Sequence, residues 1–274
     1  MTKKKSSLPA ESVRALVFVA GEFPMVHSYA ELCAGRGYAV VIDASLRGSF
    51  QSSAQETQFK FASSAPANTS VGIDLTNMDI GRKKMNVTAL DRVLPPTAPI
   101  LTSSVTVTAS EQATWIKGKH RLVGVGAFPT LTDRPVVEVA PTVSTPRETL
   151  DVVARFFGGL GKEVELVQDR IGMVLPRILC QLVNESMFAV MEDIASPSDI
   201  DTAMKLGLRH PHGPIEWGDR IGLPQVHSLL RALEQDLGED RYRAAPLLTQ
   251  LALNQASTTN DMQRLPHPQP KESQ

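Results

Sequence analysis

Two groups of residues have types and a spacing that could do chemistry on their own. His210 and His212 lie two positions apart and could bind a metal ion, but no third ligand lies nearby in the sequence, so we expect no metal site. Arg82, Lys83 and Lys84 form a basic cluster that could contact a phosphate group. A solvated helix face explains the same cluster more simply, and both interpretations stay open at this point.

The composition restricts the class of protein further. The chain has 274 residues, of which 42% are hydrophobic, and a formal net charge of -1. That is enough apolar material for one large or two modest domains, and the near-neutral charge argues against nucleic acid as a partner. No apolar run is long enough to span a membrane, and no apolar segment of a secretory signal follows Met1 to Ser7. We therefore expect a soluble, cytoplasmic protein.

Apolar runs alternate with helical patterns along the first part of the chain. Residues 14–20 and 38–43 are strand-like, and a helical stretch between them ends near residues 35–37, which is typical of the opening of a parallel α/β sheet. The pattern predicts further strands at residues 71–75, 99–103, 121–126, 136–139 and 163–167, and helices at 82–93 and 145–160. Residues 49–70 show no clear period, and we expect a loop or a poorly formed helix there.

The pattern becomes purely helical after residue 167. Apolar residues recur at steps of three and four and predict one buried helix face, formed by Ile171, Leu175, Ile178, Leu179 and Leu182. Ser196 to Asp199 has the composition of a helix start, and residues 223–237 predict a helix that Gly238 ends. We predict a Rossmann-like domain at residues 13–167 and a helical domain at 168–255, flanked by disordered segments at 1–12 and 256–274.

Two segments of the second part carry a resemblance to a known family. Residues 199–223 read DIDTAMKLGLRHPHGPIEWGDRIGL, and residues 238–247 read GEDRYRAAPL. Together they resemble the helical C-terminal domain of the 3-hydroxyacyl-CoA dehydrogenases, and residues 13–252 follow the order of elements in that family. The resemblance implies an α/β fold with a Rossmann-like parallel sheet, followed by an all-α domain of the 6-phosphogluconate-dehydrogenase-like type.

The resemblance also implies an activity. Members of the family oxidise 3-hydroxyacyl-CoA to 3-ketoacyl-CoA with NAD in fatty-acid β-oxidation. They are usually homodimers that pair through the helical domain, and their active site lies between the domains.

The segment that corresponds to the family's dinucleotide loop is altered. A GxGxxG turn lets the backbone approach the pyrophosphate, and here the segment reads Gly21-Glu22-Phe23-Pro24-Met25-Val26. Only Gly21 matches, since Phe23 and Val26 carry side chains where the family has none. Glu22 adds a negative charge beside the expected position of the pyrophosphate. These differences predict weak or absent NAD binding.

Two further positions match the family's cofactor site. Asp43, at the end of the second predicted strand, matches the acid that binds the ribose hydroxyl groups, although a solvated acid at a strand end is an equal alternative. Lys83 matches a lysine of the family, while Met78 replaces a glutamate.

The catalytic positions are altered as well. Gly126 replaces the histidine that serves as general base, a role that typically contributes about 10²–10⁴-fold in rate. Pro176 replaces an asparagine of the family. Ser103 matches a serine, and Glu138 matches the carboxylate that orients the histidine. A plain strand-end acid is the alternative for Glu138.

The sequence is compatible with two candidate functions. The chain is predicted to be a catalytically impaired relative, a pseudoenzyme that binds an acyl-CoA-like ligand or a partner protein, such as a related dehydrogenase. The alternative is an active acyl-CoA-linked oxidoreductase with altered catalytic residues.

Overall fold

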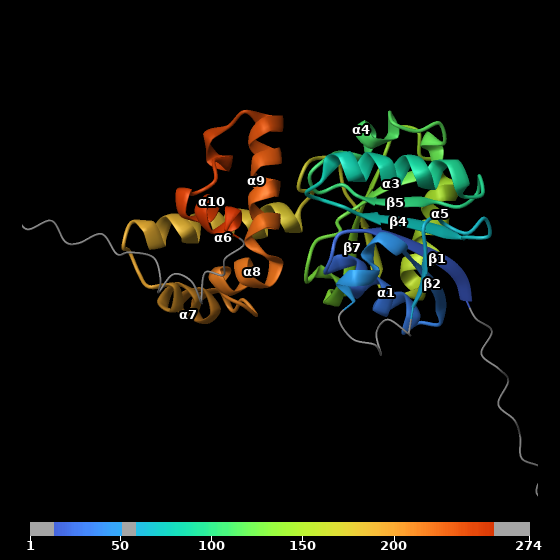
Figure 1. Ribbon diagram of the computed structural model, residues 1–274. Helices are drawn as coiled ribbons and strands as arrows, with labels where there is room; N and C mark the ends of the chain where they lie inside the picture. Colours follow the sequence, from blue (N-terminus) through green and yellow to red (C-terminus); the bar gives the residue numbers. More distant parts are fainter. Residues whose placement is uncertain (1–13, 51–58, 255–274) are drawn as a thin grey trace, which may run out of the picture.

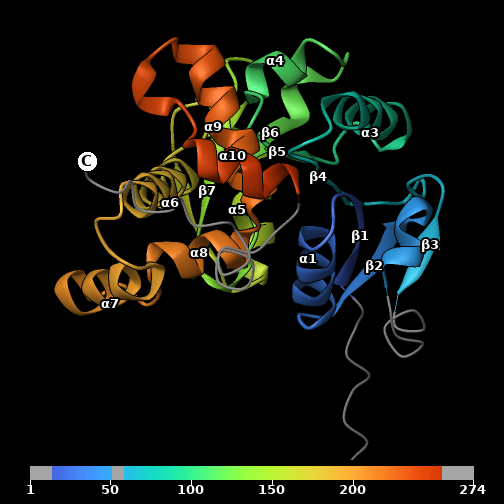
Figure 2. The ribbon, with the colours of Figure 1, turned by 60° about the vertical axis from the view of Figure 1, so that its left-hand side comes forward.

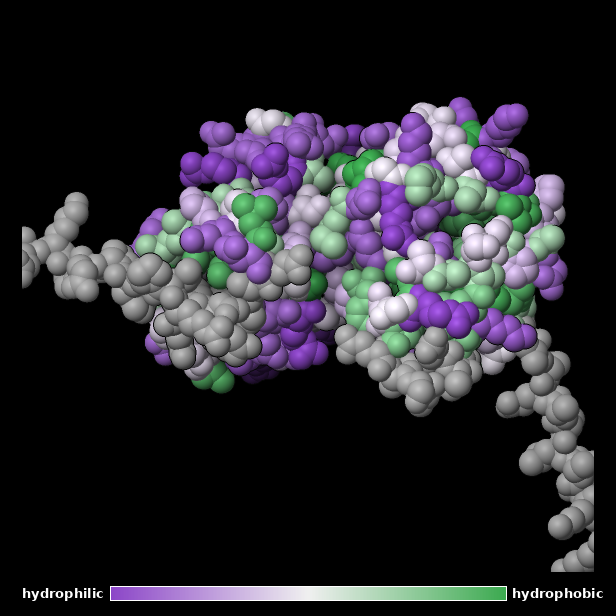
Figure 3. Space-filling view, in the orientation of Figure 1, coloured by the Kyte–Doolittle hydropathy of each residue, from purple (hydrophilic) through white to green (hydrophobic). Residues whose placement is uncertain are grey.

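The computed structural model describes residues 14–50 and 59–254, which form a sheet part and a helical part (Figure 1). The space-filling view shows the two parts as two lobes (Figure 3). The sheet has eight strands in the order β3-β2-β1-β4-β5-β6-β7-β8. Neighbouring strands are parallel except β6 and β7, which are antiparallel. The strands are β1 (Arg14–Gly21), β2 (Tyr38–Asp43), β3 (Lys60–Ala62), β4 (Val71–Leu75), β5 (Ile100–Ser103), β6 (Leu122–Val125), β7 (Val136–Pro141) and β8 (Glu163–Leu166).

Helices cover both faces of the sheet. Successive side chains of a strand point to opposite faces, so a strand buried on both sides is apolar throughout. In β1, Val17 and Val19 belong to the core that also contains α1 (Met25–Ala34) and α5 (Arg147–Gly159). Phe18 and Ala20 belong to the core with α3 (Ile80–Val93) and α4 (Ala109–Ala113). Figure 2 shows α1 and α3 on opposite sides of β1 and β4.

The described residues of the second part form five helices. They are α6 (Leu175–Met191), α7 (Pro197–Leu208), α8 (Pro214–Ile221), α9 (Leu223–Leu237) and α10 (Pro246–Leu253). Four of them contribute buried residues to one core, while α7 packs Ile200 against it. This apolar core also includes Val105 and Phe128 from the sheet part. The helical part is therefore packed onto the sheet part rather than only tethered to it.

The predicted fold class is confirmed, and several local signals have the expected form. Ser196 accepts a hydrogen bond from the Asp199 N–H at the start of α7, and Gly238 ends α9 with a positive φ of 64°. The sheet ends at Leu166 and α6 begins at Leu175. The predicted boundary near residue 168 falls between them and stays a prediction.

Two predictions were wrong. Residues 49–70, expected to lack a strand, contain β3, which pairs with β2 at the sheet edge and is defined by that pairing more than by its three residues. The helix predicted from Ile171 begins only at Leu175, and Ile178 is half exposed. The buried face of α6 instead includes Leu179, Cys180, Val183 and Met187, so it is centred about one residue further round the helix than predicted.

The remaining expectations concern the two ends of the chain, membrane-spanning helices, metal sites and the two cysteines. The segments predicted to be disordered, 1–12 and 256–274, lie outside the described residues. Within 14–50 and 59–254, no helix is long and apolar enough to cross a membrane, and no three metal-ligating side chains cluster. Cys33 and Cys180 are buried, free thiols. Burial raises the pKa of the Cys33 thiol to about 12. A cytoplasmic location stays a prediction.

Candidate functional site

The candidate site lies at the edge where the parallel strands end. Ligands of open α/β sheets bind at this edge, where the strand order changes direction, and here that point lies between β1 and β4. Gly21 ends β1 with a φ of +135°, and a Cβ atom there would lie 2.6 Å from the Leu75 backbone at the end of β4. Gly21, predicted to bind cofactor, therefore lies at this switch point, and its missing side chain permits the close approach of the two strands.

The Glu22 carboxylate spans the switch point. It accepts hydrogen bonds from the backbone N–H groups of Asn77, Met78 and Asp79 at 3.1, 2.9 and 3.0 Å. These groups immediately precede α3, where the positive end of the helix dipole favours an anion. Gln225 of α9 donates its Nε2 to the same carboxylate at 3.1 Å. The crevice expected to receive a pyrophosphate thus holds a negative side chain of the protein.

A buried polar network extends from this carboxylate. Asn77 donates its Nδ2 to the Gln225 side-chain oxygen at 3.3 Å and to the Ala127 carbonyl oxygen at 3.2 Å. Ser103, predicted to be catalytic, is fully buried with its hydroxyl 2.6 Å from Asn77 Oδ1 and 2.9 Å from the same Ala127 oxygen. The structure therefore connects Ser103 through Asn77 to Glu22, the neighbour of Gly21, and Ser103 bonds only to protein atoms of this network.

The other altered positions of the loop also carry side chains into packed surroundings. The Phe23 ring is half exposed and lies edge-on to Phe50, with ring centroids 6.2 Å apart. Val26 is fully buried in the core beneath α1. Neither position has the bare backbone of a GxGxxG turn.

Asp43 lies at the end of β2 and has a local structural role. Its carboxylate accepts the Ser45 N–H at 2.8 Å and caps the 3-10 turn Ala44–Ser49. The ribose contact predicted for Asp43 stays a prediction.

Lys83 requires a correction. Its side chain is fully buried, with Nζ 2.7 Å from Asp74 Oδ2 and 2.7 Å from the Thr76 carbonyl oxygen. Neither the predicted cofactor contact nor the alternative of a solvated helix face fits this geometry. Consecutive residues of an α-helix point about 100° apart, so Lys83 faces the sheet, while Lys84 is exposed and Arg82 is half-buried with its guanidinium donating to the Ser45 hydroxyl.

The position of the missing base lies near Glu138, as the family resemblance implies. The Gly126 N–H donates to the Glu138 carbonyl oxygen at 2.9 Å. A Cβ atom at Gly126 would lie 3.2 Å from Glu138 Cβ and 3.3 Å from Met173 Sδ. Met173 is buried and has a φ of 46°, which non-glycine residues rarely adopt. A thioether thus lies where a side chain of residue 126 would project.

The Glu138 carboxylate is bound to the start of α6. It accepts the backbone N–H groups of Val174 and Leu175 at 2.9 and 2.7 Å. Pro176 follows in the first turn of α6, where a helix leaves N–H groups without partners and a proline therefore fits well. The predicted catalytic acid and the position of the lost asparagine together form a helix start.

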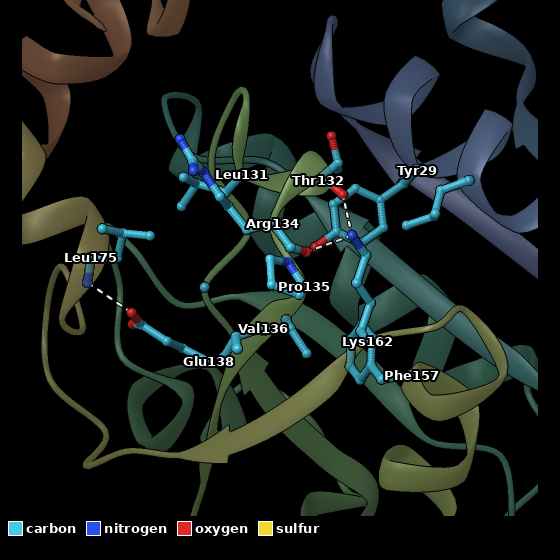
Figure 4. A pocket seen from close by; sticks show the side chains of 13 residues that line it. Tyr29, Leu131, Thr132, Arg134, Pro135, Val136, Glu138, Phe157, Lys162 and Leu175 are labelled. Atoms are coloured by element: carbon cyan, nitrogen blue, oxygen red, sulfur yellow. Dashed lines mark hydrogen bonds between the residues drawn. The ribbon is translucent and has the colours of Figure 1, made fainter. Parts of the chain in front are cut away.

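A cavity of about 240 Å³ lies beside Gly126 and Glu138 (Figure 4). Tyr29 of α1 and Lys162, which precedes β8, also line it. Burial lowers the pKa of the Lys162 ammonium, and the charge of Arg36 lowers it further against the opposing effect of Asp133.

Comparisons with known proteins agree with the arrangement of elements. The family models of the 3-hydroxyacyl-CoA dehydrogenase NAD binding domain and C-terminal domain match residues 73–170 and 172–264. The chain belongs to the 3-hydroxyacyl-CoA dehydrogenase family. The family match to the first domain begins after β1 and β2, so it does not include the Gly21–Val26 segment or Asp43.

Individual relatives support the same family. The probable 3-hydroxybutyryl-CoA dehydrogenases of Bacillus subtilis and Deinococcus radiodurans are 35% and 37% identical to this chain. These alignments cover 58% and 55% of this chain and 55% and 53% of the relatives, so the chain spans about half the length of the curated relatives it matches. The crystal structure of FadB2 from M. tuberculosis has the same fold, with a TM-score of 0.77 at 22% identity over 89% of this chain and 95% of that one.

Sequence reasoning missed the residues that connect the site. Asn77 and Gln225 are separated by 148 positions, and no motif links them. Met173 and Lys162 also lack a local pattern that would have singled them out. Glu22 had one signal, its place directly after Gly21, and that signal predicted repulsion of a phosphate rather than the hydrogen bonds observed.

Proposed function

We propose that this member of the family is impaired in hydride transfer to NAD and acts by binding an acyl-CoA-like ligand or a partner protein, such as a related dehydrogenase. The position of the Glu22 carboxylate carries the proposal. It holds three backbone N–H groups and one side-chain amide at the switch point. A pyrophosphate in the same crevice would meet a like charge and would have to displace these hydrogen bonds.

The reacting end of the site supports the same proposal. Gly126 provides no group that can accept the proton of an alcohol, and Met173 and Glu138 lie close to the space where one would project. Each oxygen of the Glu138 carboxylate accepts a backbone N–H group at the start of α6. The residues present do not fit NAD in the manner of the family.

An active oxidoreductase with altered catalytic residues is the second candidate. Family membership favours it, since the curated relatives named above carry the names of dehydrogenases.

One assay separates the two candidates. The purified chain is mixed with acetoacetyl-CoA and NADH, and the absorbance of NADH is followed beside that of a family member that retains the histidine. We expect turnover at least 100-fold below the comparator, since the general base alone is typically worth about 10²–10⁴-fold. Turnover within tenfold of the comparator would contradict the proposal and support the second candidate.

A thermal shift measurement tests the cofactor site without catalysis. A ligand that binds only the native state stabilises it by RT ln(1 + [L]/Kd). We expect millimolar NADH to leave the melting temperature unchanged, while the comparator is stabilised. We also expect Gly126→His to remain inactive, because Glu22, Phe23 and Pro176 are unchanged in that variant.

We further propose that the chain forms a homodimer through its helical part. None of the residues of α7 is buried, and the large apolar side chains of Ile194, Leu206 and Leu208 are 69%, 78% and 60% exposed. Contiguous exposed apolar patches mark interaction sites, and pairing of two chains through α7 would cover these side chains. Light scattering should give twice the 29.7 kDa of one chain, and Leu206→Asp should reduce the mass to that of a monomer. A wild-type mass of one chain would contradict the proposal.

A further inference from the structure

The cavity beside Gly126 contains two donors that protein atoms do not fully satisfy. Tyr29 is 5% exposed and lines the cavity, and none of the hydrogen bonds found between described residues involves its hydroxyl. Lys162 donates to the carbonyl oxygens of Arg134, at 2.6 Å, and of Thr132. An ammonium has three N–H groups, so one remains. Figure 4 shows both side chains in the cavity, from different elements.

The charges around these donors favour an anion. Lys162 and Arg134 line the cavity, and Arg36 lies near enough to affect Lys162. Asp133 opposes them, while the Glu138 carboxylate is already bound by the backbone at the start of α6. An acceptor that carries negative charge would therefore match the two donors and offset the burial of the ammonium.

The rest of the wall is apolar. Apart from Thr132, it is formed by Gly126, Leu32, Leu131, Pro135, Val136, Val137, Phe157 and Leu175. A water molecule takes about 30 Å³ of liquid, so a cavity of about 240 Å³ has room for about eight groups of that size. This room suits a small molecule with one polar end and a short hydrocarbon tail.

We propose that this cavity binds a short aliphatic carboxylate of about four to six carbons. Its carboxylate accepts hydrogen bonds from the Tyr29 hydroxyl and the Lys162 ammonium, and its tail lies against the apolar wall. The site goes beyond the proposed function, because it uses neither the switch point at Glu22 nor a dinucleotide. It holds whether or not the chain has dehydrogenase activity.

Calorimetric titration of the full chain with sodium hexanoate at fixed ionic strength tests the site. We expect saturable binding of one hexanoate per chain. Acetate should bind more weakly, because each further buried methylene tightens binding about fourfold. Hexan-1-ol should bind at least tenfold more weakly than hexanoate, since it lacks the charge that the two donors recognise.

Two variants test the donors. Tyr29→Phe removes one hydroxyl without a protein partner, so it should weaken hexanoate about fivefold to tenfold and leave the melting temperature unchanged. Lys162→Met should weaken hexanoate more than tenfold, and circular dichroism checks that this variant folds, since it leaves two carbonyl oxygens without their donor. Lys117→Met, which alters an exposed lysine outside the cavity, is the matched control and should bind hexanoate like the wild type.

Three results would overturn the inference. The first is no saturable hexanoate binding to the wild type. The second is unchanged affinity in Tyr29→Phe. The third is hexan-1-ol that binds as tightly as hexanoate. None of them bears on the dehydrogenase assay, so failure of this site and failure of the proposed function are distinguishable.

Discussion

Two glutamates at the same edge of the sheet both accept backbone N–H groups, but they connect different parts of the molecule. Glu138 accepts two backbone N–H groups, 36 and 37 positions along the chain, and forms the start of α6. Glu22 accepts three N–H groups 55 to 57 positions away and also the side-chain amide of Gln225, 203 positions away. One carboxylate starts a helix, while the other connects two loops of the sheet part with the helical part.

This difference shows that the role of each glutamate follows from its contacts and not from the family position to which it corresponds. By resemblance, Glu138 corresponds to a catalytic position, yet its bonds here are those of a helix cap. Glu22 corresponds to no functional residue of the family, yet it occupies the switch point with its charge satisfied by protein donors. A carboxylate that is held by the backbone is therefore not in itself a sign of catalysis, and its partners decide what it does.

Glu22→Ala should have the largest effect on stability. The substitution leaves several N–H groups without a charged acceptor, and we expect it to lower the free energy of unfolding by about 2–3 kcal/mol. Urea unfolding measures the change, and Glu165→Ala, at an exposed strand position, is the control with an expected effect within about 0.5 kcal/mol. Equal losses in the free energy of unfolding for the two substitutions would contradict a structural role for Glu22.

Glu138→Ala should have a smaller effect. Loss of a helix cap costs typically about 1 kcal/mol, and water can reach part of this helix start. Glu138→Gln, which keeps one acceptor oxygen, should recover part of the loss in the same urea experiment. A loss larger than that of Glu22→Ala would reverse the comparison between the two glutamates.

Gln225→Ala sharpens the comparison by testing the connection between the two parts. We expect a loss of about 1 kcal/mol, because the variant removes a neutral hydrogen bond to Asn77 and one donor to the Glu22 carboxylate, which keeps its three backbone donors. In a double-mutant cycle with Glu22→Ala, the two losses should deviate from additivity by about 0.5–1.5 kcal/mol. Additive losses would mean that the two side chains act independently.

Asp91, a third carboxylate, provides the smallest and most pH-dependent test. Burial alone would raise the pKa of Asp91, but the hydrogen bond and charge of Arg121 and the N–H groups of Lys117 and Gly118 together lower it. A lowered pKa means that the stabilisation is present above the unfolded value of about 3.9 and is lost as the pH falls below it.

The melting temperature from pH 7 to pH 3 measures this dependence. Asp91→Asn should lose less stability on acidification than the wild type, since it has no carboxylate to protonate. Parallel curves for the two proteins would contradict the lowered pKa.

Much of the fold follows from local patterns. Apart from Arg14 and Asp43 at their ends, β1 and β2 carry runs of apolar residues, which predict strands with both faces buried. The start of α7 and the end of α9 have the capping residues that such ends require. The strand β3 could not be predicted in this way, because its three residues are held by pairing with β2. Likewise, the start of α6 depends on Glu138, which lies far outside the helix.

The sequence by itself determined the alternation of strands and helices, the family, and the loss of glycines and of a base at the expected positions, because these depend on residue types and short spacings. Only the tertiary structure decided that Lys83 pairs with Asp74 inside the protein, that Glu22 reaches Gln225, and that Met173 lies beside Gly126. The physical reason is distance along the chain. Hydrogen bonds and ion pairs act over a few ångströms, and only packing brings residues 9, 47 or 203 positions apart within that range.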